Sequence, residues 1–212
     1  MIQLDKSLNF PPVHLALEDG LLAYGGDLSS ERLLLAYQKG IFPWFDEDDF
    51  APLWWSPDPR FVLFPDKLKI SKSMKPMLNR DDIEFKINYD FKQVIHHCKV
   101  TNRTNQLGTW ITSEMEKAYT ELHEKGIAHS AECWHRNKLV GGLYGIKLKH
   151  VFCGESMFSL MPNASKRAFI QYVAQLKQEN IQLIDCQIYT AHLESLGAEM
   201  IPRATYLNYL VD

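Results

Sequence analysis

The sequence predicts a mixed α+β or α/β fold, with a small N-terminal domain over residues 1–60 and a larger domain over residues 61–212 built on a mixed sheet. The first 60 residues are rich in glycine, proline and tryptophan, whereas later segments change between strand-like and helix-like hydrophobic periods. A chain of 212 residues is long enough for one large domain plus a small one. The apolar share of 46% and the charged share of 23% are typical of a soluble globular protein, which excludes a disordered chain.

The composition also limits the compartment and the cofactors. No apolar run approaches the ~20 residues of a membrane span, and the first residues lack the basic-then-apolar order of a secretory signal. We therefore expect a cytoplasmic protein with no membrane partner. Cys98, Cys133, Cys153 and Cys186 form no Cys-x-x-Cys pair and are expected to be buried thiols. The histidines show no zinc-site spacing, so we predict no metal site.

One helix is predicted in the N-terminal domain. Ser29 or Ser30 is placed to cap it, and Gly40 is placed to end it. Aromatic residues and prolines then gather at residues 40–45 and 54–60. Proline-rigid loops that present tryptophan often line a binding surface. The alternative is that these rings only pack the small domain on the large one.

The larger domain is predicted to alternate strands and helices. Strands are expected at residues 60–64, 84–89, 128–135, 138–148, 150–155, 183–187 and 199–202, and helices near residues 71–79, 90–99, 112–126, 164–179 and 190–197, with a helical turn at 206–210. Asn163 is expected to cap the longest helix. This order resembles the half-sheet of the acetyltransferase superfamily, in which substrates bind where neighbouring strands part. Such an analogy concerns the fold and does not give a function.

Polar side chains interrupt the strand predicted at residues 183–187. Alternation places Asp185 and Gln187 on one face, and Ile184 and Cys186 on the other. Buried acids and amides are costly unless they are paired. The two side chains are therefore either a hydrogen-bonded pair at a strand end or a site in which the carboxylate orients the amide toward a substrate. Glu155, beside a glycine that permits close approach of a ligand, favours the site.

A local excess of positive charge lies at residues 60–80, although the net charge of the whole chain is −3. Its basic residues are Arg60, Lys67, Lys69, Lys72, Lys75 and Arg80, against the single acid Asp66. Such a run is either a solvated face or a patch that contacts phosphates.

Several motifs run in order over nearly the whole chain. They include Trp54-Trp55-Ser56-Pro57-Asp58-Pro59-Arg60, Gly154-Glu155-Ser156-Met157-Phe158-Ser159 and Leu183-Ile184-Asp185-Cys186-Gln187, with further matches at residues 20–23, 25–29, 40–45, 108–111, 139–145 and 164–166. With these motifs the chain resembles the leucyl/phenylalanyl-tRNA–protein transferase family. Some relatives have a longer tail after the final tyrosine-leucine stretch. The resemblance implies the acetyltransferase-like fold of Fem and GNAT type for the larger domain.

The resemblance implies transfer of leucine or phenylalanine from its tRNA to a protein that begins with arginine or lysine, which marks that protein for N-degron degradation. It implies no cofactor, because the aminoacyl ester is already activated. It also places Asp185 and Gln187 at the reacting centre. On this interpretation Asp185 holds Gln187, whose carbonyl oxygen accepts from the attacking amine, while Glu155 binds the basic acceptor terminus.

Two sets of substrate contacts follow from the same resemblance. An apolar pocket for the amino acid is expected from Leu143, Phe152, Met157, Phe169, Tyr172 and Ile184. Because one methylene discriminates by only ~1–3 kcal/mol, methionine is a candidate third amino acid. The terminal adenosine of the tRNA is expected on Trp44 and Trp110, with Tyr37 and Tyr119 nearby. The six basic residues of the 60–80 run would contact tRNA phosphates.

Two other functions compete with this interpretation. An acetyl-CoA-dependent acetyltransferase would carry a glycine-rich pyrophosphate turn at a helix start, and none precedes residue 164. A non-catalytic RNA-binding module would use the tryptophans and the basic run, but it gives Glu155, Asp185 and Gln187 no purpose.

Overall fold

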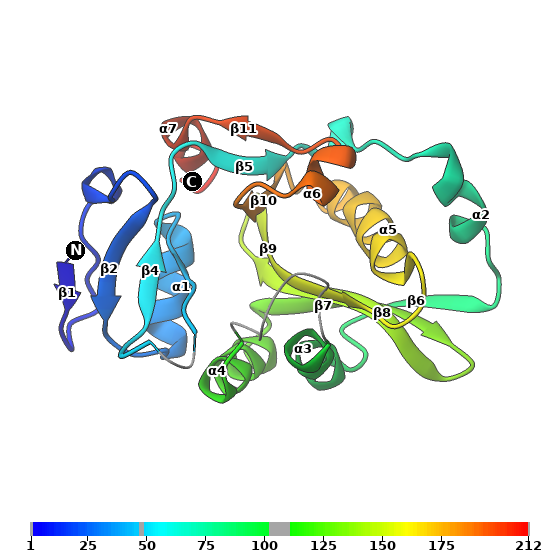
Figure 1. Cartoon of the computed structure of the whole chain (residues 1–212), viewed down its shortest axis with the longest axis horizontal. Helices are drawn as coiled ribbons and strands as arrows, with labels where there is room; N and C mark the ends of the chain where they lie inside the picture. The colour runs from blue at the N-terminus through cyan, green and yellow to red at the C-terminus, as the bar shows by residue number, and fades with distance from the viewer. Residues whose placement is uncertain (1, 47–48, 102–110, 212) are drawn as a thin grey trace.

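Two sheets of unequal size organise the computed structural model, which describes residues 2–46, 49–101 and 111–211. A four-stranded sheet of order β1-β2-β4-β3 lies at one end of the molecule, and a seven-stranded sheet of order β11-β5-β10-β9-β8-β7-β6 extends through the rest (Figure 1). In the larger sheet β9 and β10 are parallel, whereas the other neighbouring strands are antiparallel. The predicted α+β fold with a mixed sheet is therefore confirmed.

The small sheet was not predicted as strands. It consists of β1 (Ile2–Leu4), β2 (Leu21–Gly25), β3 (Phe42–Pro43) and β4 (Leu53–Trp55), with the 3-10 helix η1 (Val13–Leu15) before β2. Its strands are too short to show an alternating pattern. The predicted helix is α1 (Ser30–Gln38), capped by Ser29, which accepts from the Arg32 backbone N–H. Gly40 follows it with φ of +72°, a conformation that favours glycine.

The larger sheet follows the predicted strands closely. It contains β5 (Arg60–Leu63), β6 (Ile83–Ile87), β7 (Ala128–His135), β8 (Lys138–Lys147), β9 (Val151–Ser159), β10 (Leu183–Gln187) and β11 (Glu199–Ile201). Arg136 and Asn137, which lie between two predicted strands, both have positive φ and form the tight turn between β7 and β8. The prediction was wrong for β9, which continues past Glu155 because its second half pairs with β8 as far as Ser159.

Helices cover both faces of this sheet. They are α2 (Lys75–Leu78), α3 (Phe91–Val100), α4 (Ser113–Glu124), α5 (Ala164–Gln178), α6 (Ala191–Ser195) and α7 (Arg203–Leu207), with 3-10 helices η2 (Pro65–Lys67) and η3 (Lys72–Met74) before α2. Helices α3 and α4 pack on one face and α5 on the other (Figure 1). Asn163 holds the N-cap position of α5 in a left-handed conformation, but its side chain makes no capping bond, contrary to the prediction.

The two sheets share a hydrophobic core. The larger core cluster joins Leu33 and Trp54 of the N-terminal part to Met115 of α4 and Tyr206 of α7. A second cluster fills the space between the large sheet and α5. The domain boundary at residue 60 stays a prediction. All four cysteines are buried free thiols, as expected. Among the described residues, no helix has the length and apolar character needed to cross a membrane.

Candidate active site

A pocket of about 780 Å³ opens where β9 and β10 part. The two strands pair only from Leu183 to Asp185, opposite Val151 to Cys153. Between Asp185 and Gln187 the register of β10 against β5 shifts, and Gln187 adopts φ of +65°. This bulge turns the end of β10 away from β9, so the second half of β9 borders the pocket instead of another strand.

Asp185 lies at this bulge with no exposed surface, and four donors saturate its carboxylate. Oδ1 accepts from Arg60 Nε at 2.8 Å and from the Gln187 backbone N–H at 2.9 Å. Oδ2 accepts from Arg60 Nη2 at 2.7 Å and from the Tyr206 hydroxyl at 2.8 Å. Asp185 therefore fixes the backbone of Gln187, whereas the sequence had suggested that it holds the carboxamide.

The Gln187 carboxamide is held by Glu155 instead. Gln187 Nε2 donates to Glu155 Oε1 at 2.7 Å, and the Tyr119 hydroxyl donates to Glu155 Oε2 at 3.1 Å. The Tyr37 hydroxyl, from α1, bonds the Tyr119 hydroxyl. Burial raises the pKa of both phenols well above the ordinary value, so both stay protonated and act as donors. A hydrogen-bonded chain thus runs from α1 to the amide in the pocket.

The Glu155 carboxyl has a pKa far from its ordinary value. Burial raises the pKa of its carboxyl to about 7, and the bonds from the two tyrosines and Gln187 only partly offset this. In the described part of the chain, no three His, Cys, Asp or Glu side chains are grouped to hold a metal ion. The pocket thus offers a carboxyl group, Glu155, that can be charged or neutral near pH 7, hydrogen-bonded to the Gln187 amide, whose orientation it fixes.

Comparisons with known proteins assign the chain to a family. A model of leucyl/phenylalanyl-tRNA protein transferase matches residues 62–211, and a model of the N-terminal domain of the same transferase matches residues 26–58. The chain belongs to the leucyl/phenylalanyl-tRNA–protein transferase family. Relatives of that name from Christiangramia forsetii and Flavobacterium johnsoniae are 58% and 56% identical to it. The alignments cover 100% of both chains for the first and 99% of both for the second.

Solved structures give more distant matches. A GCN5-related N-acetyltransferase from Kribbella flavida is 9% identical, with a TM-score of 0.36 over 80% of this chain and 59% of its own. L-PGS from Bacillus licheniformis is 12% identical, with a TM-score of 0.42 over 82% of this chain and 57% of its own. As a member of the transferase family, this chain is an aminoacyltransferase.

The predicted residues of the aminoacyl pocket divide into two groups. Leu143, Phe152, Met157, Phe169 and Ile184 line the pocket described above, and their role in binding the amino acid stays a prediction. Tyr172 does not line it. Its ring is 2% exposed and packs edge-on against Phe152 at a centroid distance of 5.1 Å, so it supports the pocket wall from behind.

The residues predicted to hold the end of the tRNA also divide. Trp44 lines the pocket, is 36% exposed, and lies 5.5 Å from the Trp55 ring. Trp110 lies outside the described residues. Placing Tyr37 and Tyr119 as tRNA contacts was wrong, because their rings are buried in the core and cannot stack on a base. They support Glu155 instead.

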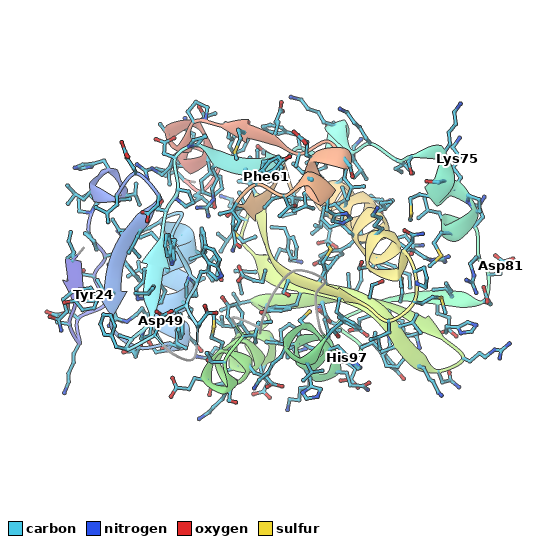
Figure 2. The ribbon with its side chains drawn as sticks, viewed as in Figure 1. Tyr24, Asp49, Phe61, Lys75, Asp81 and His97 are labelled. Atoms are coloured by element: carbon cyan, nitrogen blue, oxygen red, sulfur yellow. The ribbon has the colours of Figure 1, made fainter. Side chains whose placement is uncertain are left out.

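The basic run of residues 60–80 does not form one patch. Assigning Arg60 to it was wrong, because Arg60 is 1% exposed and paired with Asp185. Lys67 and Arg80 are partly neutralised by Glu199 and Asp82. Lys69, Lys72 and Lys75 are exposed, and they form no ion pair with any described residue. Figure 2 shows Lys75 pointing outward at the end of the molecule opposite the small sheet.

Two residues of this candidate site were not among the predicted site residues. Tyr206 bonds Asp185 from α7, and Phe42 contributes both to the pocket and to the surroundings of Arg60, whose guanidinium lies 4.7 Å from its ring centroid. Nothing local in the sequence marks Tyr206. Arg60 ends the motif at residues 54–60 and also begins the basic run, so its position in the sequence alone does not distinguish a buried ion pair from a surface charge.

Proposed function

We propose that this protein forms a peptide bond between leucine or phenylalanine, carried as an ester on tRNA, and the α-amine of an acceptor protein that begins with arginine or lysine. The observation that supports this proposal most directly is the pairing of Gln187 with Glu155 at the edge of a pocket whose walls are apolar. The apolar walls suit a side chain that makes no polar demands. The amide and acid suit an amine that must be aimed and must lose a proton.

The amine is aimed by Gln187. Its Nε2 is committed to Glu155, so its carbonyl oxygen is the atom left to accept a hydrogen bond from the acceptor amine. No described residue donates to that oxygen. As the amine nitrogen attacks the ester carbonyl, its bond to the carbonyl carbon forms, the ester C–O bond breaks, and the ribose oxygen leaves. A carboxamide cannot keep the amine proton, so Gln187 orients the amine and the ribose oxygen finally takes a proton.

Glu155 serves the acceptor in two ways. When ionised it attracts the positive charge of an N-terminal arginine or lysine. It also fixes the Gln187 amide so that the carbonyl oxygen, and not the NH2 group, faces the amine. Asp185 takes no part in proton transfer on this proposal, because its four acceptor positions are occupied.

The tRNA is bound around the pocket. The terminal adenosine would stack on Trp44, and Lys69, Lys72 and Lys75 would neutralise phosphates farther along the acceptor arm. Methionine is a third candidate amino acid, because an apolar pocket with Met157 in its wall discriminates weakly by size. The reaction needs aminoacyl-tRNA, so we place the protein in the cytoplasm, where its products enter N-degron degradation.

The test is transfer of radiolabelled leucine from Leu-tRNA to a peptide that begins with arginine, with an aspartate-initiated peptide as the acceptor control. We expect label on the arginine peptide only. Gln187→Ala should lower transfer by about 100-fold or more, in the range that loss of an aiming group produces. Gln175→Ala is the matched control, because Gln175 Nε2 bonds Glu179 in the same way but on the exposed face of α5. Full activity of Gln187→Ala would remove this residue from the mechanism.

A further inference from the structure

The Arg60 guanidinium is fixed by contacts on every side. Its guanidinium lies between the rings of Phe42 and Tyr206, 4.7 Å from each centroid. Its third nitrogen, Nη1, donates to the Gly40 carbonyl oxygen at 3.3 Å. The two remaining nitrogens, Nε and Nη2, donate one hydrogen bond each to the two carboxylate oxygens of Asp185. The arginine therefore has one position, defined by the small sheet's Gly40–Phe42 segment on one side and by α7 on the other.

The position of Asp185 in turn determines the backbone at Gln187. A φ of +65° is disfavoured for any residue other than glycine and persists only where the surroundings enforce it. At Gln187 two hydrogen bonds hold this conformation: its own backbone N–H donates to Asp185 Oδ1 at 2.9 Å, and the Ile188 N–H donates to the Cys186 carbonyl oxygen at 2.8 Å. The first of them depends on where the Asp185 carboxylate lies. That same conformation carries the Gln187 side chain to Glu155. Rotation of the Asp185 carboxylate would therefore move the amide that aims the acceptor amine.

We propose that Arg60 is a positioning residue of the transfer reaction: by orienting the Asp185 carboxylate it holds Gln187 in its left-handed conformation and so places the carboxamide in the pocket. This inference rests on the proposed role of Gln187. Arg60 touches no substrate itself. Because Phe42 both packs on the guanidinium and lines the pocket, contacts made by a substrate with this segment reach Gln187 through Arg60.

A positioning arginine and a purely structural arginine differ in how their substitution combines with the loss of Gln187. If Arg60 acts through Gln187, then Arg60→Lys already misplaces the Gln187 amide. Removing that amide as well should then lower kcat only a little further. The effects of Arg60→Lys and Gln187→Ala on kcat should therefore be strongly non-additive. Lysine keeps the positive charge beside Asp185 but lacks the planar fork that fixes the carboxylate. Tyr206→Phe removes only one hydroxyl donor from the same carboxylate and provides a second, milder perturbation.

The experiment measures kcat and KM for the arginine peptide in the wild type, both single variants and the double variant, with tRNA binding measured separately. We expect Arg60→Lys to lower kcat by about 30-fold or more, with the tRNA dissociation constant changed less than about threefold. In the Arg60→Lys background, Gln187→Ala should lower kcat by less than about fivefold further, whereas in the wild-type background it should lower kcat by about 100-fold. Tyr206→Phe should show the same pattern with smaller losses, and it replaces Arg60→Lys in the cycle if the latter does not fold.

The matched control is Arg167→Lys. Arg167 is also a buried arginine, but it donates to the carbonyl oxygens of Met77 and Ile83 and does not touch the pocket. Its effect on kcat should be small and additive with Gln187→Ala. Additive losses for Arg60→Lys, or an equal loss of kcat in Arg167→Lys, would overturn the inference. Failure of the proposed role of Gln187 itself would give a different result, namely full activity of Gln187→Ala in the wild-type background.

Discussion

Replacing Asp185 by asparagine should strongly destabilise the protein, although the two side chains have almost the same size and shape. The change removes one negative charge and replaces one acceptor oxygen by an NH2 donor, while four donors still face the position. The Arg60 guanidinium is left 1% exposed without its counter-ion. Removing one partner of a buried ion pair costs about 3–5 kcal/mol, because the other charge remains desolvated. That is a large part of the ~5–15 kcal/mol by which proteins of this kind are stable.

Urea unfolding measures this cost directly. With an m value of roughly 2–3 kcal/mol/M, Asp185→Asn should lower the unfolding midpoint by about 1–2.5 M. The double variant Arg60→Met/Asp185→Leu should recover at least half of the loss, because no charge then remains buried. A midpoint for Asp185→Asn within about 0.3 M of the wild type would refute the reasoning, because it would show that the buried guanidinium does not depend on the carboxylate. An equal loss in the double variant would locate the cost in packing and not in charge.

Three further predictions concern the pocket and its walls. Burial raises the pKa of Glu155 to about 7 from its ordinary 4.5, so its protonated form is favoured by folding; the stability it contributes is full below pH 4.5 and lost as pH rises through about 7. The unfolding midpoint of Glu155→Gln should therefore rise relative to that of the wild type as the pH increases from 5 to 8. A difference between the two midpoints that stays constant over this range would contradict this. Gly145→Ala should cost about 3 kcal/mol or more in thermal or urea unfolding, because a Cβ there would lie 2.2 Å from the Cys153 carbonyl oxygen, whereas Gly126→Ala, with open space and only a positive φ to oppose it, should cost about 1 kcal/mol. Met157→Ala should raise phenylalanine transfer relative to leucine by about threefold or more, measured as a kcat/KM ratio with the two charged tRNAs, and an unchanged ratio would show that Met157 does not select the amino acid.

The reacting centre was predictable because its unusual residues are neighbours in the sequence. Two polar side chains within an apolar strand already indicate a pair or a site. The partners of Asp185 were not predictable, since Arg60 and Tyr206 reach it across separations of 125 and 21 residues, which only the order of strands in the sheet determines. The sequence alone groups Arg60 with the basic residues that follow it, although those residues lie beyond β5 on exposed surface.

Where local signals were strong, the fold was predictable as well. The N-cap of α1, expected at Ser29 or Ser30, lies at Ser29, and Gly40 follows the helix with positive φ as expected, because capping and positive φ are local effects that depend on residue type. The strands of the small sheet were missed because each is held by its neighbours and not by its own pattern. The extension of β9 was missed for the same reason, since Gly154 and Glu155 break the alternation while β8 still supplies partners.

The position of β5 in the large sheet has a consequence for biosynthesis. Its neighbours are β10 and β11, so residues 60–63 leave the ribosome more than a hundred residues before the strands that pair with them. Until then Arg60 has no carboxylate, and Asp185 still lacks the Tyr206 hydroxyl when it emerges. Contacts of such high sequence separation form late. Helix α7, which is translated after every strand of the large sheet, thus completes the surroundings of Gln187. A nascent chain that does not yet include α7 carries a pocket in which the Gln187 amide is not fixed.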